Sequence, residues 1–166
     1  MNSVADFEDM LALLSEHQVR YLIIGGLAFI FHAKPRYTKD MDLWVEGTPD
    51  NITRANGALT EFGSPTLLDF NNPKQVLQIG VAPNRIDIIV DVEQIRFEEA
   101  WEKRIESPYG GGNACWIDLE SLLRIKSSIE HPRHQEDARV LALIVEEKRA
   151  KKSMPDNKGP GGCKPV

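Results

Sequence analysis

Hydrophobic residues along the chain recur at helical spacing in some segments and form short β-rich runs in others. Near the N-terminus, Phe7, Met10, Leu11 and Leu14 follow the helical period. The β-rich runs are bounded by glycine, proline and polar residues, as is typical of strands. The pattern predicts strands over 19–24, 41–45, 76–81, 85–91 and 114–117. It predicts helices that start near Ser3 and that span 27–31, 49–62, 97–104, 119–129 and 135–151.

The order of these segments predicts an α/β (α+β) fold with a small mixed sheet flanked by helices. Helices and strands are interspersed without an internal repeat, so a regular parallel βαβ array is not expected. The short connection 82–84 predicts a tight hairpin between two strands. Residues 34–39 are expected to form a loop, because Pro35 disfavours helix at the residue before it.

The size and charge of the chain fit one domain with a distinct C-terminus. A length of 166 residues with 42% hydrophobic residues is typical of a single core. The 20 basic and 25 acidic residues give a net charge of −5. From Lys148 onward six basic residues accompany only Asp156, so the last segment carries +5 and residues 1–147 carry −10. We therefore predict a domain over 1–147, with its C-terminal helices from about 118, and a basic, disordered tail over 148–166.

Several classes of protein do not fit the sequence. No apolar run approaches the ~20 residues of a membrane span, and the first residues lack the pattern of a signal peptide. Cys115 and Cys163 are too few for a disulfide framework or a structural zinc site, and Cys115 is expected in the core. A cytoplasmic protein is expected, and the oligomeric state is left open.

Acidic residues in two predicted strands form the strongest candidate site. Asp40 and Asp42 are two positions apart, so a strand would direct both carboxylates to one face. Asp87 lies within the apolar run 85–91, where a hydrophobic residue would otherwise be expected. If the two strands are neighbours, three carboxylates meet and could bind Mg²⁺ or Mn²⁺. Asp91 is the alternative third acid. Without a cation between them, three unpaired acids would have raised pKa values.

This arrangement resembles the nucleotidyltransferase superfamily of the DNA-polymerase-β type. Its signature is Gly-Gly or Gly-Ser, a gap of roughly ten residues, Asp-x-Asp and a third Asp on a later strand. Here Gly25-Gly26 is followed by thirteen residues and then by Asp40-Met41-Asp42. The chain is most similar to small bacterial AbiEii-like, toxin–antitoxin-type members, through the segments Pro35 to Asp42, Arg85-Ile86-Asp87, Phe97 to Trp101 and Leu122 to Lys126.

The resemblance implies a role for each matching residue. Asp40, Asp42 and Asp87 would bind the metal ions, and Asp87 would also help to deprotonate the attacking hydroxyl. Gly25 and Gly26 would let the backbone approach a triphosphate, and Lys126 would reach its phosphates. The remaining nucleotide-binding candidates are Arg36, which could equally order its loop, Thr38 and Asp137.

The match is weaker after Lys126, where the family tends to show arginine five residues on. This chain has His131 there, with Arg133 two residues away, and His134 stands where an aspartate is usual. We interpret His131-x-x-His134 as a solvated loop rather than as a metal-binding pair.

The resemblance implies an enzyme that transfers a nucleoside monophosphate from an NTP to an acceptor hydroxyl. The acceptor could be RNA such as tRNA, a protein or a small molecule. Two alternatives use the same residues differently. One is a catalytically idle protein of this fold that acts as a binding or toxin–antitoxin partner, and the other is a metal-dependent phosphohydrolase.

Overall fold

The computed structural model describes residues 3–81 and 83–154, which form six helices and six strands. The first half of the described chain contains α1 (Ser3–Glu16), β1 (Tyr21–Ile24), α2 (Gly25–His32), β2 (Asp40–Val45), α3 (Pro49–Phe62) and β3 (Val76–Ile79). The second half contains β4 (Arg85–Ile89), α4 (Phe97–Glu102), β5 (Ile105–Tyr109), β6 (Gly112–Trp116), α5 (Leu119–Ser127) and α6 (Pro132–Ser153).

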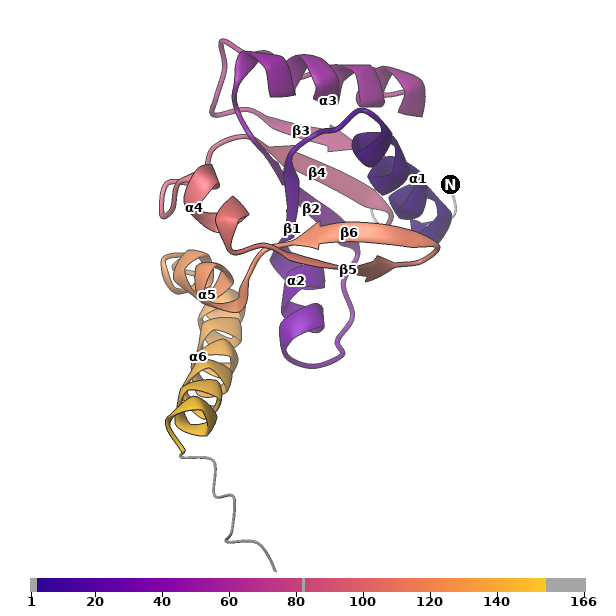
Figure 1. Cartoon of the computed structure of the whole chain (residues 1–166). Coiled ribbons are helices and arrows are strands. Elements are labelled where there is room, and N and C mark those ends of the chain that lie inside the picture. Colours follow the sequence, from indigo (N-terminus) through magenta and orange to yellow (C-terminus); the bar gives the residue numbers. More distant parts are fainter. Residues whose placement is uncertain (1–2, 82, 155–166) are drawn as a thin grey trace, which may run out of the picture.

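The six strands form one mixed sheet in the order β3-β4-β2-β1-β6-β5. β2 lies between β1, to which it is antiparallel, and β4, to which it is parallel. β3 and β4 form the antiparallel hairpin expected from the sequence. Helices α1 and α3 lie on one side of the sheet, and α2, α5 and α6 lie on the other (Figure 1). The mixed α/β fold is confirmed.

Each face of the sheet packs into its own hydrophobic cluster, because alternate residues of a strand point to opposite sides. Met41 and Leu43 of β2 pack with α1 and α3. Trp44 of β2 and Ile24 of β1 pack on the other face with α2, α5 and α6. Asp40 and Asp42 alternate with the first set, so they belong to the face of the sheet that carries α2 and α5.

Predicted helix ends agree with the structure where the sequence supplies capping residues. The Thr48 hydroxyl accepts a hydrogen bond from the Asn51 amide at the start of α3, and Gly63 ends that helix in a left-handed conformation with φ of 89°. Asp118 caps α5 by accepting a hydrogen bond from the Ser121 amide.

Three parts of the prediction need correction. Strand β5 was not predicted, because it contains Pro108 and few β-branched residues; proline is tolerated there since β5 is at the edge of the sheet. Helix α6 begins at Pro132 rather than at 135, because proline is well suited to the first turn of a helix. The same helix continues to Ser153, so a disordered tail from Lys148 is wrong for 148–153. The rest of that predicted tail, 155–166, lies outside the described residues.

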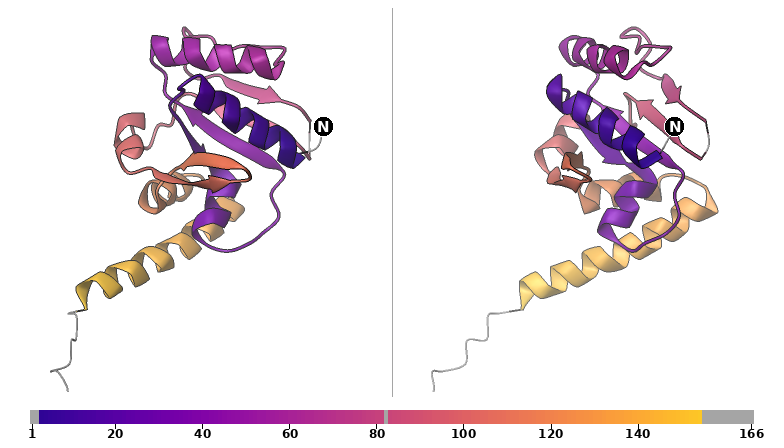
Figure 2. Two further views of the ribbon diagram at one scale, coloured as in Figure 1. Left: turned by 45° about the vertical axis from the view of Figure 1, so that its right-hand side comes forward. Right: turned by 90° about the vertical axis from the view of Figure 1, so that its right-hand side faces the viewer.

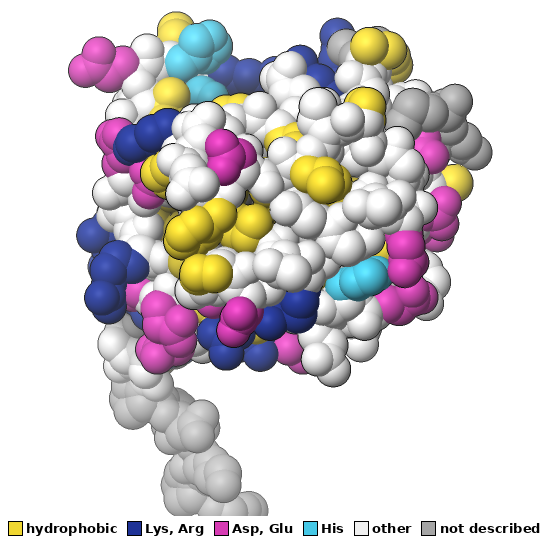
Figure 3. Space-filling view, turned by 90° about the horizontal axis from the view of Figure 1, so that it is seen from above, with side chains coloured by type: hydrophobic (Ala, Val, Ile, Leu, Met, Phe, Trp, Pro, Cys, Tyr) yellow, Lys and Arg dark blue, Asp and Glu magenta, His cyan; other side chains and the backbone are white. Residues whose placement is uncertain are grey.

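Helix α6 extends away from the body of the molecule, as two further views show (Figure 2). On the side where α3 lies, acidic, basic and hydrophobic side chains are interspersed (Figure 3). This face therefore has no single block of one charge. Within the part of the chain that the structure describes, none of the helices combines the length and the apolar character that a membrane crossing requires.

Candidate active site

Four charged residues face each other across β2 and β4. The parallel register places Asp40 opposite Arg85 and Asp42 opposite Asp87. One residue lies between the two acids on β2, and one lies between Arg85 and Asp87 on β4. All four side chains therefore lie on the same face of the sheet. The intervening Met41 and Ile86 are buried on the opposite face. The expectation that the two acidic strands are neighbours is confirmed, and the structure brings Asp40, Asp42 and Asp87 together.

Arg85 forms ion pairs with two of the three acids. Its Nε lies 2.8 Å from Asp87 Oδ1, and its Nη2 donates a hydrogen bond of 2.9 Å to Asp87 Oδ2. The same Nη2 lies 3.4 Å from Asp40 Oδ2. The expectation of three unpaired acids is therefore wrong for Asp40 and Asp87. Since Arg85 stands two residues before Asp87 on the same strand, the alternation of the strand could have indicated this pairing.

Asp42 has a different environment from the other two acids. Burial raises its pKa to about 6, and the negative charges of Asp87 and Asp40 add to this effect. Lys126 and Arg85 act in the opposite direction. No hydrogen bond joins the Asp42 side chain to another side chain or backbone group in 3–81 and 83–154. Asp42 is thus a crowded carboxylate whose ionised form would be favoured by a cation.

The chain passes directly from β1 into α2 beside Asp42. Gly25 is the first residue of α2 and has a positive φ of 68°. A Cβ on Gly25 would overlap Asp42 Oδ2, and one on Gly26 would lie 2.7 Å from Thr38 Oγ1. The helix has no side-chain cap, so the amides of its first turn remain directed outward beside the acids. Such a helix start favours phosphate.

A second charged cluster lies on α5 and α6. Lys126 is 3% exposed and its Nζ lies 3.0 Å from Asp137 Oδ2 and 3.2 Å from His134 Nδ1. Burial lowers the pKa of Lys126, and Asp137 partly offsets this effect. Asp137 also binds the guanidinium of Arg36, which lies 4.4 Å from the Phe29 ring centroid. Of the two roles expected for Arg36, these contacts match the ordering of its loop.

The two histidines after α5 do not form a solvated loop. His131 is the N-cap of α6, where its Nδ1 accepts a hydrogen bond from the Arg133 amide. His134 lies in the first turn of that helix against Lys126, and burial lowers its pKa. His134 was not among the predicted site residues, because its position depends on where α6 begins. Cys115 is half-buried, and its backbone amide donates a hydrogen bond to the Tyr21 hydroxyl.

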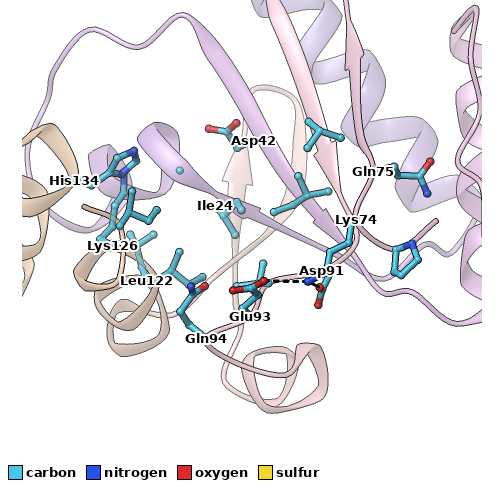
Figure 4. A pocket seen from close by; sticks show the side chains of 17 residues that line it. Ile24, Asp42, Lys74, Gln75, Asp91, Glu93, Gln94, Leu122, Lys126 and His134 are labelled. Carbon is cyan, nitrogen blue, oxygen red and sulfur yellow. Dashed lines mark hydrogen bonds and ion pairs between the residues drawn. The ribbon is translucent and has the colours of Figure 1, made fainter. Parts of the chain in front are cut away.

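A cavity of about 460 Å³ joins the two clusters. Asp42 of β2 lines it from the sheet, and Lys126 of α5 and His134 of α6 line it from the helices (Figure 4). Gly25, at the start of α2, also lines it. Leu122 and Ile125 of α5 form part of its apolar wall. At the far end Lys74 Nζ pairs with Asp91 Oδ2 at 2.7 Å and with Glu93 Oε1 at 3.1 Å. Asp91, the alternative third acid, therefore lies apart from the Asp40–Asp42 pair and is engaged by Lys74.

The chemistry of the three acids fits a divalent cation. Carboxylate oxygens are the preferred ligands of Mg²⁺ and Mn²⁺. Asp40 Oδ1 is buried and has no hydrogen-bond partner among the described residues. The same residues include no group of three His, Cys, Asp or Glu side chains already arranged around a metal position. Three carboxylates that could bind the cation are therefore present, and two of them, Asp40 and Asp87, form ion pairs with Arg85.

Comparison with known proteins supports the fold. No protein-family model matches the sequence, and no curated protein is significantly similar to it. Solved structures with this fold include the lincosamide antibiotic adenylyltransferase LnuA, with a TM-score of 0.59, 16% identity and coverage of 84% of this chain and 96% of that one. ANT(2″)-Ia in complex with adenylyl-2″-tobramycin gives a TM-score of 0.58 at 14% identity, covering 92% and 94%. A putative nucleotidyltransferase from Thermotoga maritima gives 0.52 at 12% identity, covering 88% and 91%. The chain has the nucleotidyltransferase fold.

Proposed function

We propose that this protein is a metal-dependent nucleotidyltransferase that moves a nucleoside monophosphate from an NTP to an acceptor hydroxyl. The observation that carries the proposal is the in-register pair Asp42 and Asp87, together with Asp40, beside the uncapped start of α2. A buried lysine, Lys126, lies across the same cavity. Three acids, the uncapped amides of a helix start and a lysine ammonium group thus lie around one place, as nucleotidyl transfer requires.

Different residues would bind different parts of the nucleotide and its metal ion. The first-turn amides of α2 would donate hydrogen bonds to the triphosphate, and Gly25 and Gly26 leave room for its approach. Lys126 would offset phosphate charge, with Asp137 holding its ammonium group in place. Arg36 and Thr38 would shape the loop over α2, since both side chains lie next to Gly26. Asp40, Asp42 and Asp87 would hold the divalent cation, which supplies charge neutralisation for the phosphates and the leaving group.

The transfer step conserves every atom of the substrates. The acceptor oxygen forms a bond to the α-phosphorus, the bond from the α-phosphorus to the bridging oxygen breaks, and pyrophosphate leaves. The proton of the acceptor hydroxyl passes to a carboxylate oxygen of Asp87. Arg85 holds both oxygens of that carboxylate from one side, and each oxygen keeps a further lone pair for the proton.

Two kinds of acceptor are the first to test. LnuA and ANT(2″)-Ia are described with lincomycin and with adenylyl-tobramycin, which favours small hydroxylated molecules. An RNA end such as that of tRNA, or a protein side chain, is the other acceptor expected from the sequence. The resemblance to AbiEii-like proteins is the basis for proposing a toxin–antitoxin role.

The proposal is tested by incubating the protein with Mg²⁺ or Mn²⁺, each α-³²P-labelled NTP in turn, and fractions of RNA, protein or small molecules. We expect label in one fraction with the wild type and at least about 100-fold less with Asp42→Asn. Glu146→Gln is the matched control, because Glu146 is exposed on α6, away from the acids. Inorganic phosphate without transferred label would indicate the phosphohydrolase, and binding of a protein without turnover would indicate the idle form of the fold.

A further inference from the structure

We propose that Arg85 is an internal counter-ion that competes with the divalent cation for Asp40 and Asp87, and so keeps metal affinity low until a nucleotide is bound. The inference rests on the proposed function, because it concerns the metal that nucleotidyl transfer would use. It assigns Arg85 a positioning role that acts through the two carboxylates.

The geometry places the guanidinium where it bridges the acids. Arg85 contacts Asp87 at two points, 2.8 and 2.9 Å, and Asp40 at one longer contact of 3.4 Å. The Asp87 side chain is 13% exposed, so this pair is largely shielded from water. Three carboxylates and one guanidinium on one face of the sheet carry a net charge of −2, which equals the charge that one divalent cation would neutralise.

A divalent cation that binds Asp40 and Asp87 is therefore repelled by the Arg85 guanidinium, which already contacts both carboxylates. Arg85 forms its ion pairs with Asp40 and Asp87, and no arginine within 3–81 and 83–154 forms one with Asp42. The crowded Asp42 carboxylate is therefore the first available ligand for the metal. The single contact to Asp40 is longer than the two contacts to Asp87, so we infer that the Arg85–Asp40 contact opens first. Arg85 can then remain on Asp87, which keeps that carboxylate oriented.

Nucleotide binding gives the Arg85 guanidinium a new partner in place of Asp40. Arginine binds phosphate oxygens as well as carboxylates, because its planar donors match both groups. A triphosphate at the start of α2 would lie beside Asp42, on the same face of the sheet as Arg85. Metal and nucleotide are therefore expected to bind together, with each weak when alone.

The test is the Mn²⁺ affinity of the nucleotide-free protein, measured from the EPR signal of free Mn²⁺. Arg85→Met removes the charge and keeps much of the side-chain volume, and we expect it to bind Mn²⁺ about tenfold or more tightly than the wild type. Arg85→Lys keeps the charge, and we expect its affinity to stay within about threefold of the wild type. Arg124→Met is the matched control, because Arg124 pairs with Glu99 away from the acids and its loss changes the net charge equally.

Unchanged or weaker Mn²⁺ binding by Arg85→Met would overturn the proposal, since a residue that only organises the acids would leave a poorer site when removed. An equal gain in Arg124→Met would also overturn it, because net charge alone would then explain the effect. If thermal unfolding shows that Arg85→Met has lost its fold, Arg85→Gln replaces it.

This test is separate from that of the proposed function. Failure to transfer label to any acceptor would reject nucleotidyl transfer and leave the Mn²⁺ comparison intact. Label transfer combined with unchanged Mn²⁺ affinity in Arg85→Met would reject only the role given to Arg85.

Discussion

Asp137 and Lys126 form an ion pair in which Oδ2 and Nζ are 3.0 Å apart and both side chains are less than 5% exposed. Asp137 also binds Arg36, so one carboxylate connects the loop 34–39 with α5 and α6. Lys126 and the loop 34–39 are thus held in place by the last helix, which begins at Pro132.

Replacing Asp137 with asparagine should destabilise the protein strongly. The change leaves two cations beside a neutral amide in a buried site, and such a loss costs about 3–5 kcal/mol of unfolding free energy. Urea denaturation measures it. Glu120→Gln is the control, because the exposed Glu120–Arg149 pair should contribute less than about 1 kcal/mol. A loss as small as that of the control would show that Asp137 does not hold Lys126 and Arg36.

The raised pKa of Asp42 predicts a pH-dependent stability. The folded protein binds this proton more tightly than the unfolded chain, whose carboxyl has a pKa of 3.8. The stabilisation that comes from protonated Asp42 is therefore complete below pH 3.8 and is lost as the pH rises through about 6. Asp42→Asn removes the charge, so we expect it to be more stable than the wild type at pH 8 by about 1–3 kcal/mol.

Thermal unfolding of both proteins from pH 4 to pH 8, without metal, measures this difference. The difference in unfolding temperature between the wild type and Asp42→Asn should become smaller as the pH falls from 7 towards 4. Glu146→Gln should follow the wild type throughout, because Glu146 is exposed. A constant gap across the range would contradict the account of Asp42.

Gly25→Ala should disturb the site without a change of charge. Alanine is strained at a φ of 68°, and its Cβ would overlap the Asp42 carboxylate. We expect a loss of about 1–3 kcal/mol of stability together with loss of label transfer. Gly111→Ala is the matched control, because a Cβ there would meet nothing within 4 Å. Equal behaviour of the two variants in both assays would show that Gly25 is not required beside Asp42.

Much of the fold and the acidic site could be predicted from the sequence because the signals were local. The alternation of Asp40 and Asp42 with Met41 and Leu43 fixes the face that each side chain takes once β2 is recognised. The capping residues Thr48 and Asp118 likewise act on amides only three residues away.

The remaining features depend on contacts between distant segments. The pairing of Arg36 with Asp137 joins residues about a hundred positions apart, and no local pattern indicates it. His134 reaches Lys126 only because α6 starts at Pro132 and packs against α5. Arg85 is different, because it stands two residues before Asp87 on the same strand and the alternation of β4 places both on one face.

The most direct test of nucleotidyl transfer follows both ends of the triphosphate in one reaction. ATP labelled at the α- or the γ-phosphate is incubated with Mg²⁺ and an acceptor fraction, using the wild type, Asp42→Asn and Asp87→Asn. We predict α-label on the acceptor and an equal amount of γ-label in pyrophosphate, with both absent from the two variants. Release of γ-label as inorganic phosphate, or transfer that persists in both variants, would contradict it.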